Sequence, residues 1–484
     1  MKFKFLLTVL YILSISFSIS AQNKLNKLKN EVILSVESHQ ENLIKISDRI
    51  WALAETALEE TKSSQLLSEY AENQGFVIQN NVAGMPTAFI ASYGSGKPII
   101  GILGEFDALP GLSQKAEPVK VTYEEGKPGH GCGHNLFGTA SLGAAVAIKE
   151  LIQKGELTGS IRFYGTPAEE TIGGKLYMAR EGLFDDLDIC LDWHPGAEIE
   201  ADAQSSQALV DFRVRFTGKA SHAAADPWNG VSAVDALELY TTGINYIREH
   251  VKPTVRIHYL IEKAGDVVNV VPENAVIWTR VRDKDREGMN LVYERIQKIA
   301  EGAALMTDAG FSIQLISGWH EILVNRTGAS VVQKNLEILG PIEYTEEEIN
   351  FAKTIQSATN KPPVGLDGKI YDLKETREDP PGGSTDVGDV SWIVPEIRLS
   401  VTTAPKDTPW HSWAVVACGG MSIGHKGMIY AAKALSLTMV DLYMNQGLRD
   451  EIRKEFIERK GEYIYKAILP EGPPPVPAFG MIKE

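Results

Sequence analysis

The residues with the most evident chemistry lie in a glycine-rich segment, GHGCGHNLFG, at positions 129–138. Cys132 and His134 are two positions apart in this segment, and a thiolate and a neutral imidazole are good ligands for zinc and related ions. The glycines permit backbone angles with which a loop can wrap a small ion. The same pair also fits a Cys132 nucleophile with His134 as its base, or a surface loop without chemistry.

Two adjacent carboxylates follow in GTPAEETIGGK, positions 165–175, where Glu169 and Glu170 come after a β-like run. Neighbouring carboxylates repel each other, and different environments often separate their pKa values. One of them can then bind a metal while the other stays free as a base. The segment alone does not distinguish this arrangement from two solvated glutamates at the start of a helix.

Two single histidines extend the pattern. His194 ends an apolar run in CLDWHPG, positions 190–196, and His411 lies between two tryptophans in TPWHSW, positions 408–413. Strand ends of this kind are where active-site residues of α/β sheets gather. A lone histidine is more often structural, but four polar clusters at the strand ends of one layered domain favour a shared metal site. The nearby acids and histidines also favour a metal over a Cys132 nucleophile.

Three residues in the middle of the chain suit a polar or anionic ligand. His222 lies in KASHAAADPWNG before a helical pattern, Asn269 lies in VVNVVPEN, and Arg282 ends a strand-like run. Loop hydrogen bonds and a surface ion pair are the alternative interpretation. For Arg282, the residues alone favour the ion pair.

The segment GMSIG, positions 420–424, matches the nucleophile-elbow pattern G-x-S-x-G. A triad of that class needs an acid and then a histidine after the serine. Only His425 follows Ser422, with no acid between them, so the match fits chance. The sequence also contains no H-E-x-x-H segment and no P-loop.

The first half of the chain alternates helical and strand-like patterns, which predicts an α/β layered domain that positions these clusters. Helices are expected at 26–74 and 139–151, and strands at 88–93, 98–103, 160–164 and 188–193. After residue 323 the chain is expected to return to this domain, with a loop over 360–383 and a helix over 415–442.

In the middle of the chain, the pattern of apolar residues changes. Strands are expected at 208–216, 255–261, 275–282 and 311–316, and helices at 231–250 and 286–304. This β-α-β-β-α-β order is that of a ferredoxin-like unit. We therefore expect an inserted domain at 207–323, between catalytic parts at 22–206 and 324–484.

Size and charge set limits on the function. A chain of 484 residues is too long for one ordinary core, which favours two domains. Its 44% apolar and 23% charged residues are typical of a soluble globular protein. A net charge of −15 repels phosphate backbones and disfavours nucleic acid as a partner. Three cysteines do not make a disulfide framework.

The N-terminus has the order of a secretory signal peptide. Lys2 and Lys4 precede an apolar run at 5–17 and a small-residue end at 18–21. The run is shorter than the roughly 20 residues of a membrane span. We expect cleavage after Ala21 and export to the periplasm or the exterior.

Several motifs together resemble one family, the two-metal amidohydrolases that include aminoacylases, hippurate hydrolases and glutamate carboxypeptidases. The resemblance is greatest to the p-aminobenzoyl-glutamate hydrolase branch and covers nearly the whole chain after residue 21. It implies an exopeptidase-like catalytic domain with an inserted lid and dimerisation domain. The motifs run in this order: GEFDALPGLSQ, GHGCGHNLFGTA, YGTPAEE, DWHPG, ASHAA, NVVP, GGSTDVGDVSW and HKGMIYAAKAL.

The resemblance implies a set of metal ligands. Cys132 would bridge two divalent ions, manganese or zinc, where other branches use aspartate. The remaining ligands would be His134, Glu170, His194 and His411. Asp107, in GEFDALP, matches an acid beneath the metal site that orients its ligands.

The resemblance also implies catalytic and substrate-binding roles. Glu169 would be the general base and later the acid. His222 would reach across a dimer, formed by two lids, to polarise the scissile carbonyl. Asn269 and Arg282 would bind the substrate's carboxylate. The branch contains two related subunits, so the expected partner is a second copy of this chain or a related subunit.

Two features depart from the related branches. GSTDVGDV, positions 383–390, stands where many relatives have Gly-Glu-Asp-Phe, and the p-aminobenzoyl-glutamate branch shares this form. The signal peptide is unusual because that branch is usually cytoplasmic.

The expected activity is hydrolysis of the amide bond of an N-acyl or aroyl amino acid, with p-aminobenzoyl-glutamate or a similar N-acyl-glutamate as substrate. One alternative is an exported dipeptidase or general N-acyl-amino-acid hydrolase. An alternative of another class is a non-catalytic metal-binding or peptide-binding protein on the same fold.

Overall fold

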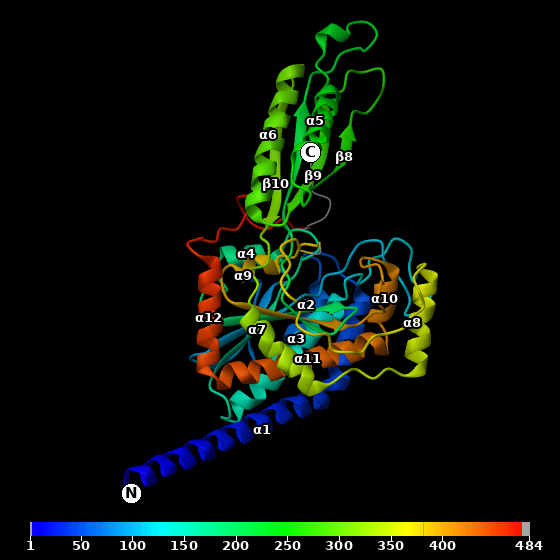
Figure 1. The fold of residues 1–484 in the computed structure, drawn as a ribbon. Helices are drawn as coiled ribbons and strands as arrows, with labels where there is room; N and C mark the ends of the chain where they lie inside the picture. Colours follow the sequence, from blue (N-terminus) through cyan, green and yellow to red (C-terminus); the bar gives the residue numbers. More distant parts are fainter. Residues whose placement is uncertain (1, 381, 477–484) are drawn as a thin grey trace.

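The larger of two sheets is a mixed seven-stranded sheet (Figure 1). The computed structural model describes residues 2–380 and 382–476, with side chains from residue 22 on. The strand order is β1-β2-β4-β3-β5-β11-β6. The strands are β1 (Val77–Asn80), β2 (Phe89–Ser95), β3 (Ile99–Gly104), β4 (Gly159–Gly165), β5 (Ile189–Gly196), β6 (Glu200–Asp202) and β11 (Glu396–Thr402).

The centre of this sheet is parallel, with β4, β3, β5 and β11 as neighbours. Parallel strands are covered on both faces and therefore read as continuous apolar runs, as in IIGILG of β3. Their carboxyl ends meet at one edge, where β3, β4 and β11 lead into the predicted site segments and β5 carries His194. The predicted α/β layered domain is confirmed.

Helices cover both faces of the sheet. The helices α1 (Lys2–Leu53), α3 (His134–Gln153), α7 (Arg326–Leu339) and α11 (Ser422–Met444) share one apolar core. On the other face lie α4 (Gly174–Arg180) and α9 (Val387–Ser391). The remaining helices are α2 (Thr61–Asn73), α8 (Glu346–Ala358), α10 (Trp413–Gly419) and α12 (Gln446–Lys460). Because α3 packs against the sheet and two helices, it is buried almost all round.

The helix expected over 26–74 is wrong in one place. The chain leaves the helix after Leu53 and resumes at Thr61. Ala54 and Leu58 adopt positive φ angles of 44° and 60°, which no α-helix contains. The loop between them passes beside the site, since Thr56 pairs with Ala108.

The second sheet is antiparallel, with strand order β10-β7-β9-β8, and projects from the larger part in Figure 1. Its elements are β7 (Ala208–Thr217), α5 (Ala233–Ile247), β8 (Arg256–Ala264), β9 (Asn274–Asp283), α6 (Arg286–Thr307) and β10 (Gly310–Trp319). The predicted β-α-β-β-α-β order is confirmed, and we call this unit the lid. The domain boundaries at 206/207 and 323/324 stay predictions.

The lid has a base and a tip. β7 leaves the larger part at Ala208 and ends at Thr217, a strand of ten residues. At about 3.3 Å per residue this strand spans roughly 30 Å. The loops that follow β7 and β8 therefore lie at the tip, and the end of β9 lies at the base.

The N-terminal prediction is untested by the fold. Met1 and the side chains of residues 2–21 lie outside the described part, and the predicted cleavage point after Ala21 falls within α1. Among the described helices, none combines the length and apolarity needed to cross a membrane.

Candidate metal centre

The five predicted ligands lie together at the carboxyl edge of the sheet. Their ligand atoms form two groups in which all atoms lie within 4.8 Å of one another. Cys132 belongs to both groups, so its thiolate can serve two ions at once. The first group is Cys132, His134 and His194, and the second is Cys132, Glu170 and His411.

Two of the histidines are oriented through their Nδ1 atoms. His134 Nδ1 lies 2.9 Å from Asp107 Oδ1, and His194 Nδ1 lies 2.8 Å from the carbonyl oxygen of Pro195. A ring nitrogen that donates to an oxygen leaves the other nitrogen free for a metal. His194 Nε2 lies 3.5 Å from Cys132 Sγ. Asp107 therefore contacts one of the predicted ligands, and its role in orienting them stays a prediction.

Unusual backbone angles position two of the ligands. Gly133, between Cys132 and His134, has φ 79°, and a Cβ there would meet the Pro195 ring at 3.1 Å. His411 also has a positive φ, 56°, and its amide donates to the Gly131 carbonyl at 3.0 Å. Such angles are costly for a residue with a Cβ and persist where surrounding contacts fix them.

The donor set fits divalent metal ions. Among the described residues, three buried side-chain atoms of this cluster lack hydrogen-bond partners: His134 Nε2, Glu170 Oε1 and Glu105 Oε2. His134 Nε2 and Glu105 Oε2 face each other at 3.1 Å, whereas Glu170 Oε1 is left unpaired, at a cost of about 1–3 kcal/mol that a bound cation would remove. A set of imidazole, thiolate and carboxylate ligands accommodates zinc or manganese.

The charges of the cluster oppose a cysteine nucleophile. Burial raises the pKa of the Cys132 thiol, and the neighbouring Glu170 raises it further. Burial also raises the pKa of Glu170, to about 7, and lowers that of His194 to about 4. Since a nucleophile must be a thiolate at working pH, Cys132 needs a metal to lose its proton.

Glu169 and Glu170 lie in different groups despite being adjacent. Glu170 Oε2 lies 3.6 Å from His411 Nε2. Glu169 instead lies with His134 and Glu105 in a third group of close ligand atoms. Burial, and then the charge of Glu105, raise the pKa of Glu169 well above its ordinary value. The two adjacent glutamates thus have different neighbours, His411 for Glu170 and Glu105 with His134 for Glu169.

Sequence reasoning missed Glu105, which is 1% exposed. Its signal was its position two residues before Asp107, on the same side of an extended strand end. Glu105 Oε1 accepts from Lys175 Nζ at 2.6 Å, and Lys175 Nζ also donates to Asp386 Oδ1 at 2.6 Å. Asp386 comes from GSTDVGDV, so the segment that departs from related branches contributes to the site.

The lid residues do not all reach the centre. Arg282 lies at the base of the lid, where its Nε donates to Ser384 Oγ at 3.3 Å. His222 is exposed at the tip, and its Nδ1 accepts from the amides of Ala224 and Ala225 at 3.2 Å. The Asn269 carbonyl accepts from the Ala223 amide at 3.1 Å, which places Asn269 beside His222.

The G-x-S-x-G segment forms no nucleophile elbow. Ser422 is the first residue of α11 and follows α10, whereas an elbow joins a strand to a helix. His425 Nε2 lies 2.7 Å from Asp48 Oδ1. The prediction that this match is fortuitous agrees with the fold.

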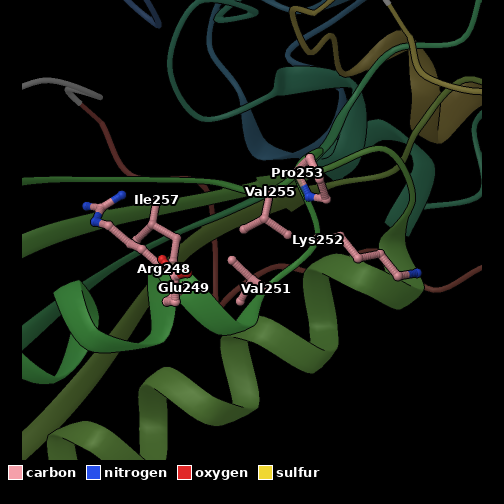
Figure 2. A pocket seen from close by; sticks show the side chains of 7 residues that line it. All are labelled: Arg248, Glu249, Val251, Lys252, Pro253, Val255 and Ile257. Atoms are coloured by element: carbon pink, nitrogen blue, oxygen red, sulfur yellow. The ribbon is translucent and has the colours of Figure 1, made fainter.

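A cavity of about 330 Å³ lies in the lid between the end of α5 and β8, and Figure 2 shows the side chains that line it. It is lined by seven residues between Arg248 and Ile257, three of them charged: Arg248, Glu249 and Lys252. None is a predicted site residue.

Comparison with known proteins identifies the class. Residues 101–311 match peptidase family M20/M25/M40. The chain is 38% identical over 471 residues to one of the subunits of p-aminobenzoyl-glutamate hydrolase of Escherichia coli strain K12, and the match covers 92% of this chain and 98% of that protein. The chain therefore belongs to peptidase family M20/M25/M40, and it is a hydrolase that acts on amide bonds.

Two further similarities are more distant. The chain is 28% identical over 453 residues to Xaa-Arg dipeptidase of Mus musculus, covering 90% of this chain and 94% of that protein. The crystal structure of aminobenzoyl-glutamate utilization protein from Klebsiella pneumoniae matches with a TM-score of 0.59 and 16% identity, covering 85% of this chain and 97% of that one. The predicted family resemblance and fold class are confirmed, and the non-catalytic alternative is set aside.

Proposed function

We propose that this chain uses two divalent metal ions to hydrolyse the amide bond of an N-acyl amino acid, with p-aminobenzoyl-glutamate or a similar N-acyl-glutamate as substrate. The observation that carries the proposal is the pair of ligand groups that share Cys132, with Glu169 outside both. The substrate is supported by the 38% identity to the p-aminobenzoyl-glutamate hydrolase chain of Escherichia coli.

The metal ions are proposed to be manganese or zinc. They would supply Lewis acidity toward the attacking water and the scissile carbonyl. Their proposed ligands are Cys132, His134, Glu170, His194 and His411.

Glu169 is the proposed proton carrier. It takes a proton from the attacking water at its carboxylate and delivers that proton to the nitrogen of the leaving amine. A raised pKa suits both steps, because the carboxyl must gain and release a proton during one turnover. Its burial, at 8% exposure, excludes competing water.

Substrate recognition is proposed to involve Arg282, Asn269 and His222. Burial lowers the pKa of His411, and the positive charge of Arg282 contributes to that shift, which supports Arg282 as a neighbour of the centre. Arg282 is thus suited to bind a substrate carboxylate. His222 and Asn269 lie together at the lid tip, which is the reason to propose that they serve a partner's site.

The proposed partner is a second copy or a related subunit that pairs through the lid. β8 is an edge strand of the lid sheet, and it exposes Leu260 by 60% and Ile261 by 46%. An exposed apolar edge strand is a ready surface for pairing. A related-subunit partner is supported by the Escherichia coli relative, because that protein is itself one subunit of its enzyme.

We also propose that the enzyme is exported, because residues 2–21 have the order of a signal peptide. A substrate for such an enzyme would be scavenged outside the cytoplasm. A second candidate, an exported dipeptidase or general N-acyl-amino-acid hydrolase, is supported by the 28% identity to Xaa-Arg dipeptidase over 90% of this chain. It differs in the acyl group and keeps the mechanism.

The test is hydrolysis by purified residues 22–484, stripped with a chelator and reloaded with manganese or zinc. The panel contains p-aminobenzoyl-glutamate, hippurate and simple dipeptides. We expect metal-dependent glutamate release from the first, well above the others. Turnover mainly of dipeptides would move the substrate to the second candidate, and no turnover with both metals bound would overturn the proposal.

A further inference from the structure

The residues before and after Glu169 have their backbone amides held by buried carboxyl groups. The Glu170 amide donates to Asp107 Oδ2 at 2.9 Å, and the Ala168 amide donates to Glu60 Oε1 at 3.1 Å. Asp107 also orients His134, so it belongs to the ligand framework. Glu60, in contrast, makes its hydrogen bond to this segment through the Ala168 amide, and the charge of Asp107 also acts on its carboxyl.

Glu60 can make this contact because another residue, Glu55, caps helix α2 in its place. It occupies the N-cap position of α2, where an acidic side chain ordinarily accepts from the first-turn amides. Its side chain makes no capping bond, and Glu55 Oε2 accepts from the Ser63 amide at 2.8 Å instead. The carboxyl of Glu60 is thereby free to turn inward toward Ala168.

The inward carboxyl is buried and anchored at its second oxygen. Glu60 is 0% exposed, and Thr87 Oγ1 lies 2.8 Å from its Oε2. Thr87 is itself tied to α2, since its carbonyl accepts from Ser64 Oγ at 2.8 Å. The acceptor for Ala168 therefore has a fixed position.

Ala168 has a backbone conformation that needs such support. Its φ is 61°, in the left-handed region, which is strained for a residue with a Cβ. Its carbonyl accepts from the Gly173 amide at 3.0 Å, so the residue is held on both sides. A return to an ordinary φ would rotate the following peptide and redirect Glu169 and Glu170.

We propose that Glu60 is a positioning residue for the reaction: its carboxyl fixes the Ala168 peptide in the conformation that directs Glu169 away from the ligand Glu170. This inference rests on the proposed function, in which Glu169 is the base. Glu60 touches neither the substrate nor the metal ligands' side chains, and it acts through the backbone.

Hydrogen-bond chemistry predicts which substitutions are tolerated. Ala168 needs an acceptor oxygen, which a carboxylate, a neutral carboxyl or an amide all supply. Burial, and then the charge of Asp107, raise the pKa of Glu60 to about 8. Glu60 accepts through both oxygens, from the Ala168 amide and from Thr87 Oγ1. Glutamine keeps one acceptor oxygen for Ala168, and the Thr87 hydroxyl can accept from its NH₂ group.

The experiment compares Glu60→Ala, Glu60→Gln and Ser68→Ala in the full mature enzyme, with kcat, KM and bound metal measured for each. Glu60→Ala is expected to lower kcat roughly ten- to hundredfold, the scale of an ångström-level misplacement. KM and metal content should stay within about twofold, and Glu60→Gln should keep kcat within about threefold. Ser68→Ala is the matched control, because Ser68 lies on α2 and its hydroxyl donates to the Gln65 carbonyl at 3.2 Å, outside the contacts that hold Glu60.

A rescue variant separates positioning from simple destabilisation. Glycine adopts a left-handed φ without the Cβ cost. The double variant Glu60→Ala with Ala168→Gly is therefore expected to recover part of the lost kcat. If Glu60→Ala does not fold, Glu60→Asp withdraws the acceptor by one methylene and is expected to show the same loss of kcat.

Three outcomes would overturn the inference: an unchanged kcat without the acceptor, an equal loss in Glu60→Gln, or a loss explained by missing metal. The proposed function is tested separately by Glu169→Gln. If that variant is active, the base assignment fails. If it is inactive while Glu60→Ala is fully active, only the positioning role fails.

Discussion

The metal centre and the lid tip carry predicted functional residues in opposite ways. At the centre, Cys132 and His134 are buried, and Asp107 from a distant part of the chain holds His134, whereas His411 is exposed. At the tip, His222 is exposed and contacts only its own loop and the neighbouring loop that contains Asn269. The difference accords with our proposals that one chain positions the metal ligands and Glu169, and that His222 serves a partner's site.

The surroundings of the tip support this distinction. Val268 is 98% exposed and Trp228 is 78% exposed, and both lie in the tip loops. Large apolar side chains gathered at one exposed place mark interaction surfaces more often than chance. The tip therefore has the character of a binding surface, and the centre that of a preformed site.

The largest expected effect is the loss of both metal ions when Cys132 is replaced. Cys132→Ala is expected to lose both metal ions and all measurable hydrolysis, because both ligand groups contain this thiol. His411→Ala, which affects one group, is the comparison and should keep one ion. Metal stoichiometry by mass spectrometry checks both, and retention of two ions in Cys132→Ala would contradict the shared-ligand arrangement.

The second effect concerns the base. Glu169→Gln is expected to lower kcat by roughly 10²–10⁴-fold while both ions stay bound, since general acid–base catalysis contributes on that scale. Glu181→Gln, at a more exposed glutamate at the end of α4, is the matched control. Near-normal turnover in Glu169→Gln would contradict the proposal that Glu169 is the general base.

The sequence predicted the ligand segments because each is a short pattern at a strand end, as with Cys132 and His134. It did not predict Glu60 or Lys175, whose partners lie 108 and 211 residues away. Such contacts depend on how loops meet in the fold. The loop at 54–60, which contains Glu60, was also not predicted. The apolar residues of this loop have the spacing of a helix, so a continuous helix was expected over 26–74.

The third effect concerns how much a buried ion pair beside the metal centre contributes to the stability of the fold. Lys175→Met leaves Glu105 and Asp386 buried without their cation, which is expected to destabilise the fold by about 3–5 kcal/mol. The comparison is Lys263→Met, near the tip, where an exposed pair with Asp266 at 3.6 Å contributes about 0–1 kcal/mol. Chemical denaturation of the metal-free proteins measures both. Equal losses would remove the contrast between the two regions.

The smallest of these effects addresses the tip directly. His222→Ala is expected to lower kcat by roughly 10²-fold, as for loss of one donor to a developing oxyanion. If His222 serves a partner's site, mixing this variant with Glu169→Gln creates dimers in which one site has both an intact Glu169 and an intact His222. Random pairing of two chains then restores up to about a quarter of the wild-type rate. If His222 acts within its own chain, no pairing of these variants contains an intact site, and the mixture stays as inactive as its parts. The mixing result therefore decides whether His222 acts at the metal centre of its own chain or at that of a partner.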